Sequence, residues 1–254
     1  MDELLETEFD TVAAWTEAAV AELGQDHAIP AACRGSGRPS DLAWLADGLE
    51  LTDGDRFLDA GSGLGGPTAW LVTEFGWRWQ GPVLLAEPMK LAAAASVRLF
   101  GHPAVAAWTE NLPLPDESVD AAWALGVLDT LDDKREVLTE LHRVLRPGAR
   151  LGLLVLVARG EHANDLESNS FPTDVELHRD LTACGFRVVD RIDTAALADA
   201  PPEWTTRADA VEEVVARDHR SEEAWRQAEQ QTETLTRLLD EREVVSVLLR
   251  TARV

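Results

Sequence analysis

The sequence of 254 residues contains only two cysteines and no tyrosine. Cys33 and Cys184 are too few and too isolated for a zinc cluster or a disulfide framework, so no metal site is expected. The longest uninterrupted apolar run, residues 153–158, is far shorter than the roughly 20 residues of a membrane-spanning helix. The absence of these features favours an ordinary globular protein with a sizeable core.

Basic residues are also scarce, since 23 Lys and Arg stand against 46 Asp and Glu, for a net charge of -23. Such a charge repels phosphate backbones and anionic lipid, so neither nucleic acid nor a membrane is an expected partner. The opening stretch MDELLETEFD lacks the basic residues of a signal peptide. We therefore expect a cytoplasmic protein whose partner is a neutral or cationic small molecule.

Short apolar stretches alternate with helical patterns between residues 56 and 193. Strands that are apolar throughout and separated by helices are typical of a parallel sheet covered on both faces, so we predict a doubly wound, Rossmann-like α/β fold. The strands are expected at 56–60, 82–87, 104–108, 119–126, 150–158, 186–192 and 243–254. The helices between them are expected from about residue 67 and at 89–100, 133–145 and 173–184.

Four segments are predicted along the chain. Residues 1–50 form an N-terminal helical lid segment, 51–194 the core, 195–241 a helical insertion, and 242–254 the final strand of the core sheet. Within the first segment, the Gly-, Pro- and Ser-rich stretch 24–40 is predicted to be a mobile connection, and the next helix is predicted to begin at an N-cap of Ser40 or Asp41. The insertion serves either as a lid or as the surface of a homodimer.

The stretch LDAGSGLGGPTAW, residues 58–70, places four glycines directly after the first strand. Gly61, Gly63 and Gly66 spell the dinucleotide fingerprint G-x-G-x-x-G, whereas Asp59 with Gly61, Gly63 and Gly65 spells D-x-G-x-G-x-G. Either pattern predicts a tight turn and a helix whose first N–H groups face a nucleotide. The glycines alone therefore leave an NAD-dependent oxidoreductase open.

Two acids bear on the choice of nucleotide. Asp59 would repel a dianionic pyrophosphate but suits a ligand that carries an ammonium and a sulfonium. Glu87, at the end of the second strand, can accept hydrogen bonds from both hydroxyls of a ribose. Because both nucleotide families use such an acid, Glu87 does not separate them.

Three segments carry a family resemblance: LDAGSGLGG at 58–66, LPLPDESVD at 112–120 and RVLRPGA at 143–149. With them the chain resembles the class I S-adenosylmethionine-dependent methyltransferases, especially the branch that includes the ubiquinone and menaquinone biosynthesis enzymes. The resemblance implies a seven-stranded sheet whose last strand is antiparallel, with S-adenosylmethionine lying across the carboxyl ends of the first strands.

The resemblance also implies a cofactor site. Asp59 and the turn of Gly61, Ser62, Gly63 and Gly65 would hold the methionine portion, Glu87 the ribose, and Met89 one face of the adenine. Thr109, Glu110 and Asn111 would border the adenine edge, and Leu125 would flank the sulfonium. Trp108 departs from the family pattern, because many relatives have an Asp there; a tryptophan would instead stack on the base.

The expected activity is methyl transfer to oxygen, nitrogen or carbon of a small molecule, by in-line displacement that needs no metal. A non-catalytic binding protein of the same fold remains a second alternative. Asp129 is a candidate for a general base, with the alternative that it caps the following helix. His27, Cys33 and Arg34 are candidates for lining the substrate pocket. Any of the nine tryptophans in that pocket would favour a flat or cationic acceptor.

Overall fold

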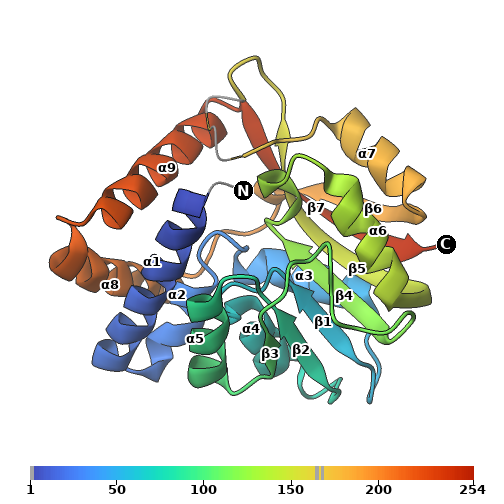
Figure 1. Cartoon of the computed structure of the whole chain (residues 1–254), viewed down its shortest axis with the longest axis horizontal. Coiled ribbons are helices and arrows are strands. Elements are labelled where there is room, and N and C mark those ends of the chain that lie inside the picture. The colour runs from blue at the N-terminus through green and yellow to red at the C-terminus, as the bar shows by residue number, and fades with distance from the viewer. Residues whose placement is uncertain (1–2, 164–165, 167–168) are drawn as a thin grey trace.

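Seven strands form one sheet in the order β3-β2-β1-β4-β5-β7-β6 (Figure 1). The structure, a computed structural model, describes residues 3–163, 166 and 169–254; residues 1 and 2 of the predicted N-terminal segment lie outside the described residues. The strands are β1 (Phe57–Ala60), β2 (Val83–Ala86), β3 (Ala104–Val105), β4 (Val119–Leu125), β5 (Leu145–Ala158), β6 (Phe186–Asp193) and β7 (Val244–Arg253). β7 runs antiparallel to β5 and β6, and the other pairs are parallel. The predicted fold class is confirmed.

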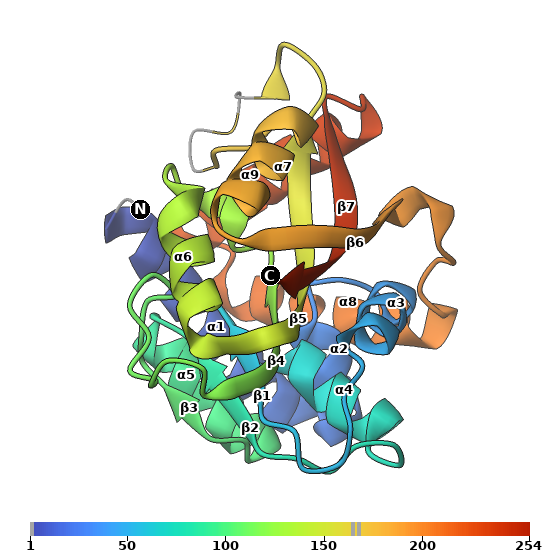
Figure 2. The same ribbon diagram turned by 90° about the vertical axis from the view of Figure 1, so that its right-hand side faces the viewer.

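Helices cover both faces of this sheet (Figure 2). α3 (Pro39–Leu49) and α4 (Gly66–Phe75) pack on one face around Phe57 and Trp123, whereas α6 (Lys134–Val144) and α7 (Asp174–Ala183) pack on the other. α6 presents Val137, Leu138, Leu141 and Val144 at three- and four-residue spacing, and all four side chains are fully buried. The alternation of apolar strands and amphipathic helices therefore builds a three-layered core.

Arg143 joins two of the segments that carry the family resemblance, residues 112–120 and residues 143–149. Its guanidinium donates hydrogen bonds to the carbonyl oxygens of Leu114 at 2.7 Å and Leu112 at 3.1 Å, and to the Asp116 carboxylate at 2.7 Å. A planar guanidinium with five N–H donors can satisfy several hydrogen-bond acceptors of such a loop at once. These motif residues therefore hold the loop before β4 in place and do not contact the pocket.

Four further helices gather beside the sheet, at the left of Figure 1. They are α1 (Glu3–Leu23), α2 (Ala28–Ala32), α8 (Pro202–His219) and α9 (Glu223–Asp240), and the described α1 contacts α5 (Lys90–Phe100), α8 and α9. Ala19, Val20, Ala28, Ala31, Val211 and Val215 form their buried core. The predicted N-terminal segment and the predicted insertion thus lie against each other.

The prediction of a mobile connection at 24–40 is wrong. Residues 28–32 form α2, and Ala28, Ala31 and Ala32 are buried. α2 approaches the start of α4 so closely that a Cβ at Gly66 would lie 2.4 Å from the carbonyl carbon of Ala32. A five-residue helix is too short to be stable alone, so its presence depends on this tertiary packing and leaves no periodic signal.

Some predicted boundaries also need correction. α3 is capped by Arg38 rather than by Ser40 or Asp41, because Asp41 is the third helical residue and its carboxylate accepts from the Arg38 backbone N–H at 2.9 Å. The expected strand at 104–108 is reduced to two residues, and β5 begins at Leu145. α5 ends as predicted at Gly101, whose φ of 75° favours glycine.

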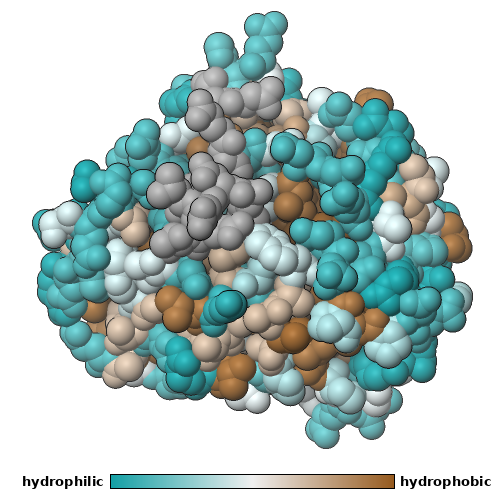
Figure 3. Space-filling model, viewed as in Figure 1, coloured by the Kyte–Doolittle hydropathy of each residue, from teal (hydrophilic) through white to brown (hydrophobic). Residues whose placement is uncertain are grey.

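The surface agrees with the acidic composition. On the face seen in Figure 3, hydrophilic residues cover most of the left and right margins, and hydrophobic residues reach the surface mainly across the lower middle of the view. Across the described residues, no helix combines the length and the apolar character that crossing a bilayer requires.

Candidate cofactor and acceptor site

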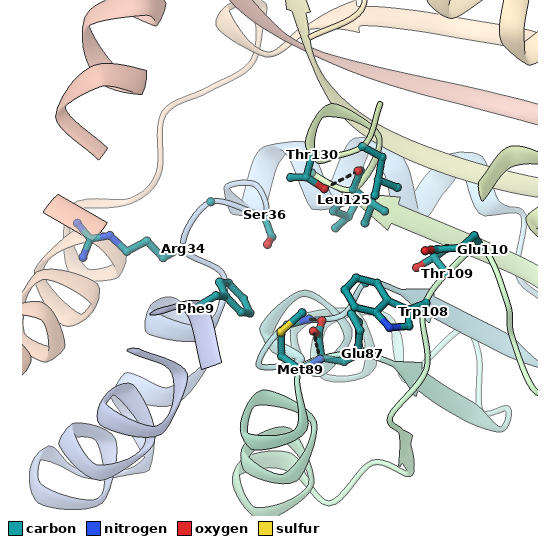
Figure 4. A pocket seen from close by; sticks show the side chains of 17 residues that line it. Phe9, Arg34, Ser36, Glu87, Met89, Trp108, Thr109, Glu110, Leu125 and Thr130 are labelled. Atoms are coloured by element: carbon teal, nitrogen blue, oxygen red, sulfur yellow. Dashed lines mark hydrogen bonds between the residues drawn. The ribbon is translucent and has the colours of Figure 1, made fainter. Parts of the chain in front are cut away.

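A pocket of about 260 Å³ opens at the carboxyl ends of the parallel strands. It lies at β1, where the strand order reverses, because β2 and β3 follow on one side of β1 and β4 and β5 on the other. Ligands of open α/β sheets bind at such a reversal of strand order. Its walls come from the turn after β1, the loops after β2, β3 and β4, the helix α1, and the connection from α2 to α3 (Figure 4). The cofactor residues predicted from the sequence that line it are Gly61, Gly63, Glu87, Met89, Trp108, Thr109, Glu110 and Leu125.

The glycine-rich turn is held tightly against β2. The amides of Gly61 and Ser62 both donate to the carbonyl oxygen of Ala86, at 2.8 and 3.1 Å. Gly61 has a φ of 71°, and a Cβ on it would lie 2.4 Å from Cγ2 of Val127. Glycine is therefore needed at this position for both its backbone angle and its closeness to the loop after β4.

Glu87 lies on the floor of the pocket and is 4% exposed. Its Oε2 accepts the Gly63 amide at 2.7 Å and its Oε1 accepts the Met89 amide at 2.9 Å. Burial raises the pKa of this carboxyl to about 7, against the lowering effect of the two amides. Since each carboxylate oxygen has two lone pairs, each retains one for a ligand hydroxyl.

Asp59 does not line the pocket but lies beneath the turn, 1% exposed. Its Oδ2 accepts the hydroxyl of Thr68 on α4 at 2.6 Å. Burial raises the pKa of Asp59 to about 6, although the Thr68 hydrogen bond lowers it. Asp59 therefore ties the turn to α4 and places a titratable carboxyl behind it.

Ser62 and Gly65 belong to the same turn but do not line the pocket. The Ser62 hydroxyl is buried and has no hydrogen-bond partner in the described part of the chain. The amide of Gly65 donates to the Ser62 carbonyl oxygen at 2.8 Å and closes the turn. An orphaned buried hydroxyl beside the pocket is the kind of group that a bound ligand satisfies.

The residues after β3 form one side wall. Met89 is buried below, and Trp108 packs against the cluster of Met89, Ala92 and Ala13. Figure 4 shows Trp108 opposite Phe9, with Glu87 and Met89 below and Leu125 and Thr130 above. Asn111 lies outside the pocket, where its backbone N–H donates to the Trp108 carbonyl oxygen at 3.0 Å.

Asp129 is 2% exposed and does not line the pocket, although its neighbours Thr130 and Leu131 do. Burial raises the pKa of Asp129 to about 6, and one of its carboxylate oxygens has no hydrogen-bond partner among the described residues. The alternative role as a helix cap is wrong, because Asp133 caps α6 by accepting the Arg135 amide at 3.0 Å. The Asp129 carboxylate is therefore not part of the pocket lining.

Several pocket residues were not predicted from the sequence: Phe9, Gly35, Ser36, Pro88 and Leu131. Phe9 reaches the pocket because its neighbour Asp10 caps α5, accepting the amides of Leu91 and Ala92 at 2.6 and 2.9 Å. That contact joins residues far apart in the chain and leaves no local signal. Of the three candidates for lining the substrate pocket, Arg34 lines it, and Cys33 and His27 do not.

A family model described as a methyltransferase domain matches residues 58–153. The methyltransferase GfsG of Streptomyces halstedii is 32% identical over 120 residues, which are 46% of this chain and 43% of that protein. The chain spans about half the length or less of the curated relatives that it matches first. The matches do not single out the ubiquinone and menaquinone branch, which stays a prediction.

Solved structures show the same fold. The [4+2]-cyclase SpnF superposes with a TM-score of 0.65 at 22% identity, covering 84% of this chain and 79% of the other. A geranyl diphosphate methyltransferase solved in complex with S-adenosylmethionine has a TM-score of 0.62 at 18% identity, covering 85% of each chain. At such identities the likeness concerns the fold, which is shared by proteins with different reactions.

Proposed function

Because residues 58–153 match a model described as a methyltransferase domain and the chain has the fold of the class I S-adenosylmethionine-dependent methyltransferases, we propose that this protein transfers a methyl group from S-adenosylmethionine to a small-molecule acceptor. The observation that carries the proposal is the buried Glu87 carboxylate, which is held by the Gly63 and Met89 amides on the pocket floor. Its two free lone pairs suit the two hydroxyls of a ribose.

The remaining cofactor contacts follow from the pocket walls. In this proposal Met89 and Trp108 lie against the adenine, Thr109 and Glu110 border its edge, and Gly61 and Gly63 leave room for the methionine portion. Asp59 and Ser62 support the turn from behind, Gly65 shapes it, and Leu125 flanks the sulfonium. Asn111 supports the adenine edge from outside the pocket, through its backbone hydrogen bond to Trp108. When bound, S-adenosylmethionine supplies an electrophilic methyl carbon on a sulfonium. The acidic surroundings favour that charged cofactor over its neutral product.

The acceptor is proposed to be neutral or cationic and partly aromatic or apolar. Phe9, Leu125 and Leu131 provide apolar walls beside the position proposed for the sulfonium. Since Asp129 lies outside the pocket, the proposed acceptor has a nucleophile that reacts without a strong base, such as an amine or an acidic phenol. Rate enhancement then comes mainly from holding the nucleophile in line with the methyl group. α1, which carries Phe9, is proposed to act with α8 and α9 as a lid over the acceptor.

Calorimetric titration tests the cofactor. S-adenosylhomocysteine and S-adenosylmethionine are expected to bind, whereas NADH is expected to give no heat. Binding of NADH in place of S-adenosylhomocysteine would instead support the oxidoreductase alternative. The second step is transfer of a labelled methyl group into a metabolite extract.

A second candidate, a protein that binds the cofactor without transferring a methyl group, is favoured by one comparison, since the same fold occurs in a [4+2]-cyclase. It predicts S-adenosylhomocysteine binding with no label transferred to any acceptor. The two candidates therefore differ in the transfer experiment and agree in the binding experiment.

A further inference from the structure

A second cavity of about 120 Å³ lies among α1, α2, α8 and α9. Its wall includes Val12 of α1, Ala31 of α2, Val211 and Val215 of α8, and Trp225 of α9, and further Ala, Thr, Glu and Arg side chains complete it. Seven of the twelve lining residues are apolar, and an apolar cavity of about 150 Å³ is large enough to bind benzene. The geometry of the helix cluster thus leaves space for a short apolar group.

Arg34 lines both this cavity and the cofactor pocket. Its guanidinium forms an ion pair with the Glu212 carboxylate on α8. Figure 4 shows the side chain directed away from Glu87 and Trp108, toward that side of the molecule. The Arg34 side chain therefore borders both spaces while its charged end is held by α8.

The ion pair is about half exposed, with side chains 48% and 38% accessible for Arg34 and Glu212. Exposed pairs contribute little free energy because solvent screens them. Substitution of either partner is therefore expected to open the way to the second cavity at little cost to the fold. Each methylene that enters an apolar site raises the affinity about fourfold.

We infer that the second cavity receives the tail of an acceptor with a polar head and an unbranched apolar chain, and that Arg34, held by Glu212, sets the length of chain that fits. This inference rests on the proposed methyltransferase function, because only that function makes the ligand a methyl acceptor. The head lies in the pocket with the cofactor, and the tail extends toward Val211 and Trp225 as far as Arg34 allows.

The test uses a series of 4-n-alkylphenols, from methyl to hexyl, titrated calorimetrically into the protein saturated with S-adenosylhomocysteine. Affinity is expected to rise about fourfold per methylene and then level off where the tail meets Arg34. In Arg34→Ala the rise continues for further methylenes. Val211→Trp in the Arg34→Ala background fills the second cavity and is expected to restore the shorter limit.

Arg217→Ala is the matched control. Arg217 also joins α8 to α1, through an ion pair with Glu22 at 2.9 Å, but it lines neither cavity. Its chain-length limit is expected to equal that of the wild type. If Arg34→Ala does not fold, Glu212→Gln tests the same point, because it releases the guanidinium and is expected to lengthen the limit.

An equal limit in the wild type and the Arg34→Ala or Glu212→Gln variant, with S-adenosylhomocysteine binding intact, overturns this inference and leaves the proposed function untouched. In the converse outcome, the protein fails to bind S-adenosylhomocysteine while the alkylphenol titrations without that compound show the shifted limit. That result supports the second cavity as a tail site and overturns the proposed function. The two failures are therefore distinguishable.

Discussion

The backbone amide of Gly63 donates a 2.7 Å hydrogen bond to Oε2 of Glu87. This bond joins the turn after β1 to the end of β2, and the Met89 amide holds the other oxygen of the same carboxylate at 2.9 Å. The orientation of Glu87 is therefore set by the backbone before any ligand arrives. Preorganised charged acceptors of this kind form the stronger hydrogen bonds of a binding site.

Glu87→Gln tests this arrangement. The amide group of Gln presents an N–H to one of the two backbone donors and loses the charge, so S-adenosylhomocysteine is expected to bind about 10- to 150-fold more weakly, from about 1.5–3 kcal/mol for hydrogen bonds to a charged group. Calorimetric titration measures the change. Glu74→Gln, which neutralises an acid of α4 outside the pocket, is the control and should leave the affinity unaltered. Equal affinities for the wild type and Glu87→Gln would remove Glu87 from the cofactor site.

The stability of the unliganded protein should depend on pH through Glu87. Its pKa is raised from 4.5 to about 7 in the folded state, so between these values the folded protein holds a proton that the unfolded chain has released. The free energy of unfolding therefore falls as pH rises through this window, by up to about 3 kcal/mol from this group. The Glu87→Gln variant has no carboxyl at this position, so its free energy of unfolding should not show this fall with pH.

Urea unfolding of both proteins at pH 5 and pH 8 measures the difference. Asp59 and Asp129, whose pKa values are raised to about 6, contribute losses of the same sign in both proteins, so the difference between wild type and variant reports Glu87 together with its coupling to Asp59. Unfolding free energies that change by the same amount in the two proteins would show that Glu87 is not protonated near neutral pH.

Much of the pocket floor could be predicted from the sequence because it is built from the ends of consecutive parallel strands. Gly61, Glu87 and Leu125 each lie at the carboxyl end of a strand, or directly after one, that is recognisable from its own apolar run. Such ends meet at one edge of the sheet whatever the rest of the chain does. The sheet order and the antiparallel last strand came instead from the family resemblance.

The walls above the floor could not be predicted in this way. Phe9 depends on the Asp10 carboxylate capping α5, and α2 depends on packing against α4 and α8. Neither contact has a local pattern, because capping by a distant carboxylate and burial of a five-residue helix are decided only when the elements meet. Asp129 shows how far strand-end reasoning reaches, since its position after β4 suggests the pocket, whereas its buried carboxylate does not line it.

The closeness of Gly61 to Val127 predicts the effect of a methyl group there. Gly61→Ala places a Cβ 2.4 Å from Cγ2 of Val127 and must also adopt a φ of 71°. We expect a loss of about 2–5 kcal/mol in the free energy of unfolding, combining about 1–2 for the backbone angle with about 1–3 for overpacking. Val127 also lines the pocket, so weaker S-adenosylhomocysteine binding is expected as well.

Gly54→Ala separates the two causes, because Gly54 has a φ of 88° but no atom within 4 Å of the position that its new methyl group would take. Its loss should be limited to about 1–2 kcal/mol from the backbone angle. The double variant Gly61→Ala with Val127→Ala should recover part of the cofactor affinity. Equal losses at Gly61 and Gly54 would mean that Val127 moves aside without cost and that closeness is not what requires glycine.

Trp108 faces the pocket beside Met89, at a position where the family resemblance implies an Asp. If its indole stacks on the adenine, Trp108→Ala should weaken S-adenosylhomocysteine binding by about 5- to 150-fold, from about 1–3 kcal/mol for stacking of a base on an aromatic side chain. Trp108→Phe keeps an aromatic face and should lose less than about threefold in affinity, as expected when most of the stacking energy is kept. Trp77→Ala, which removes a side chain that is 80% exposed and outside the pocket, serves as the control and should bind like the wild type.

Stacking also quenches indole fluorescence, so the signal change on titration should disappear in Trp108→Phe and persist in Trp77→Ala. Unchanged affinity in Trp108→Ala would assign the indole to packing against Met89 alone and leave recognition of the adenine to Thr109 and Glu110.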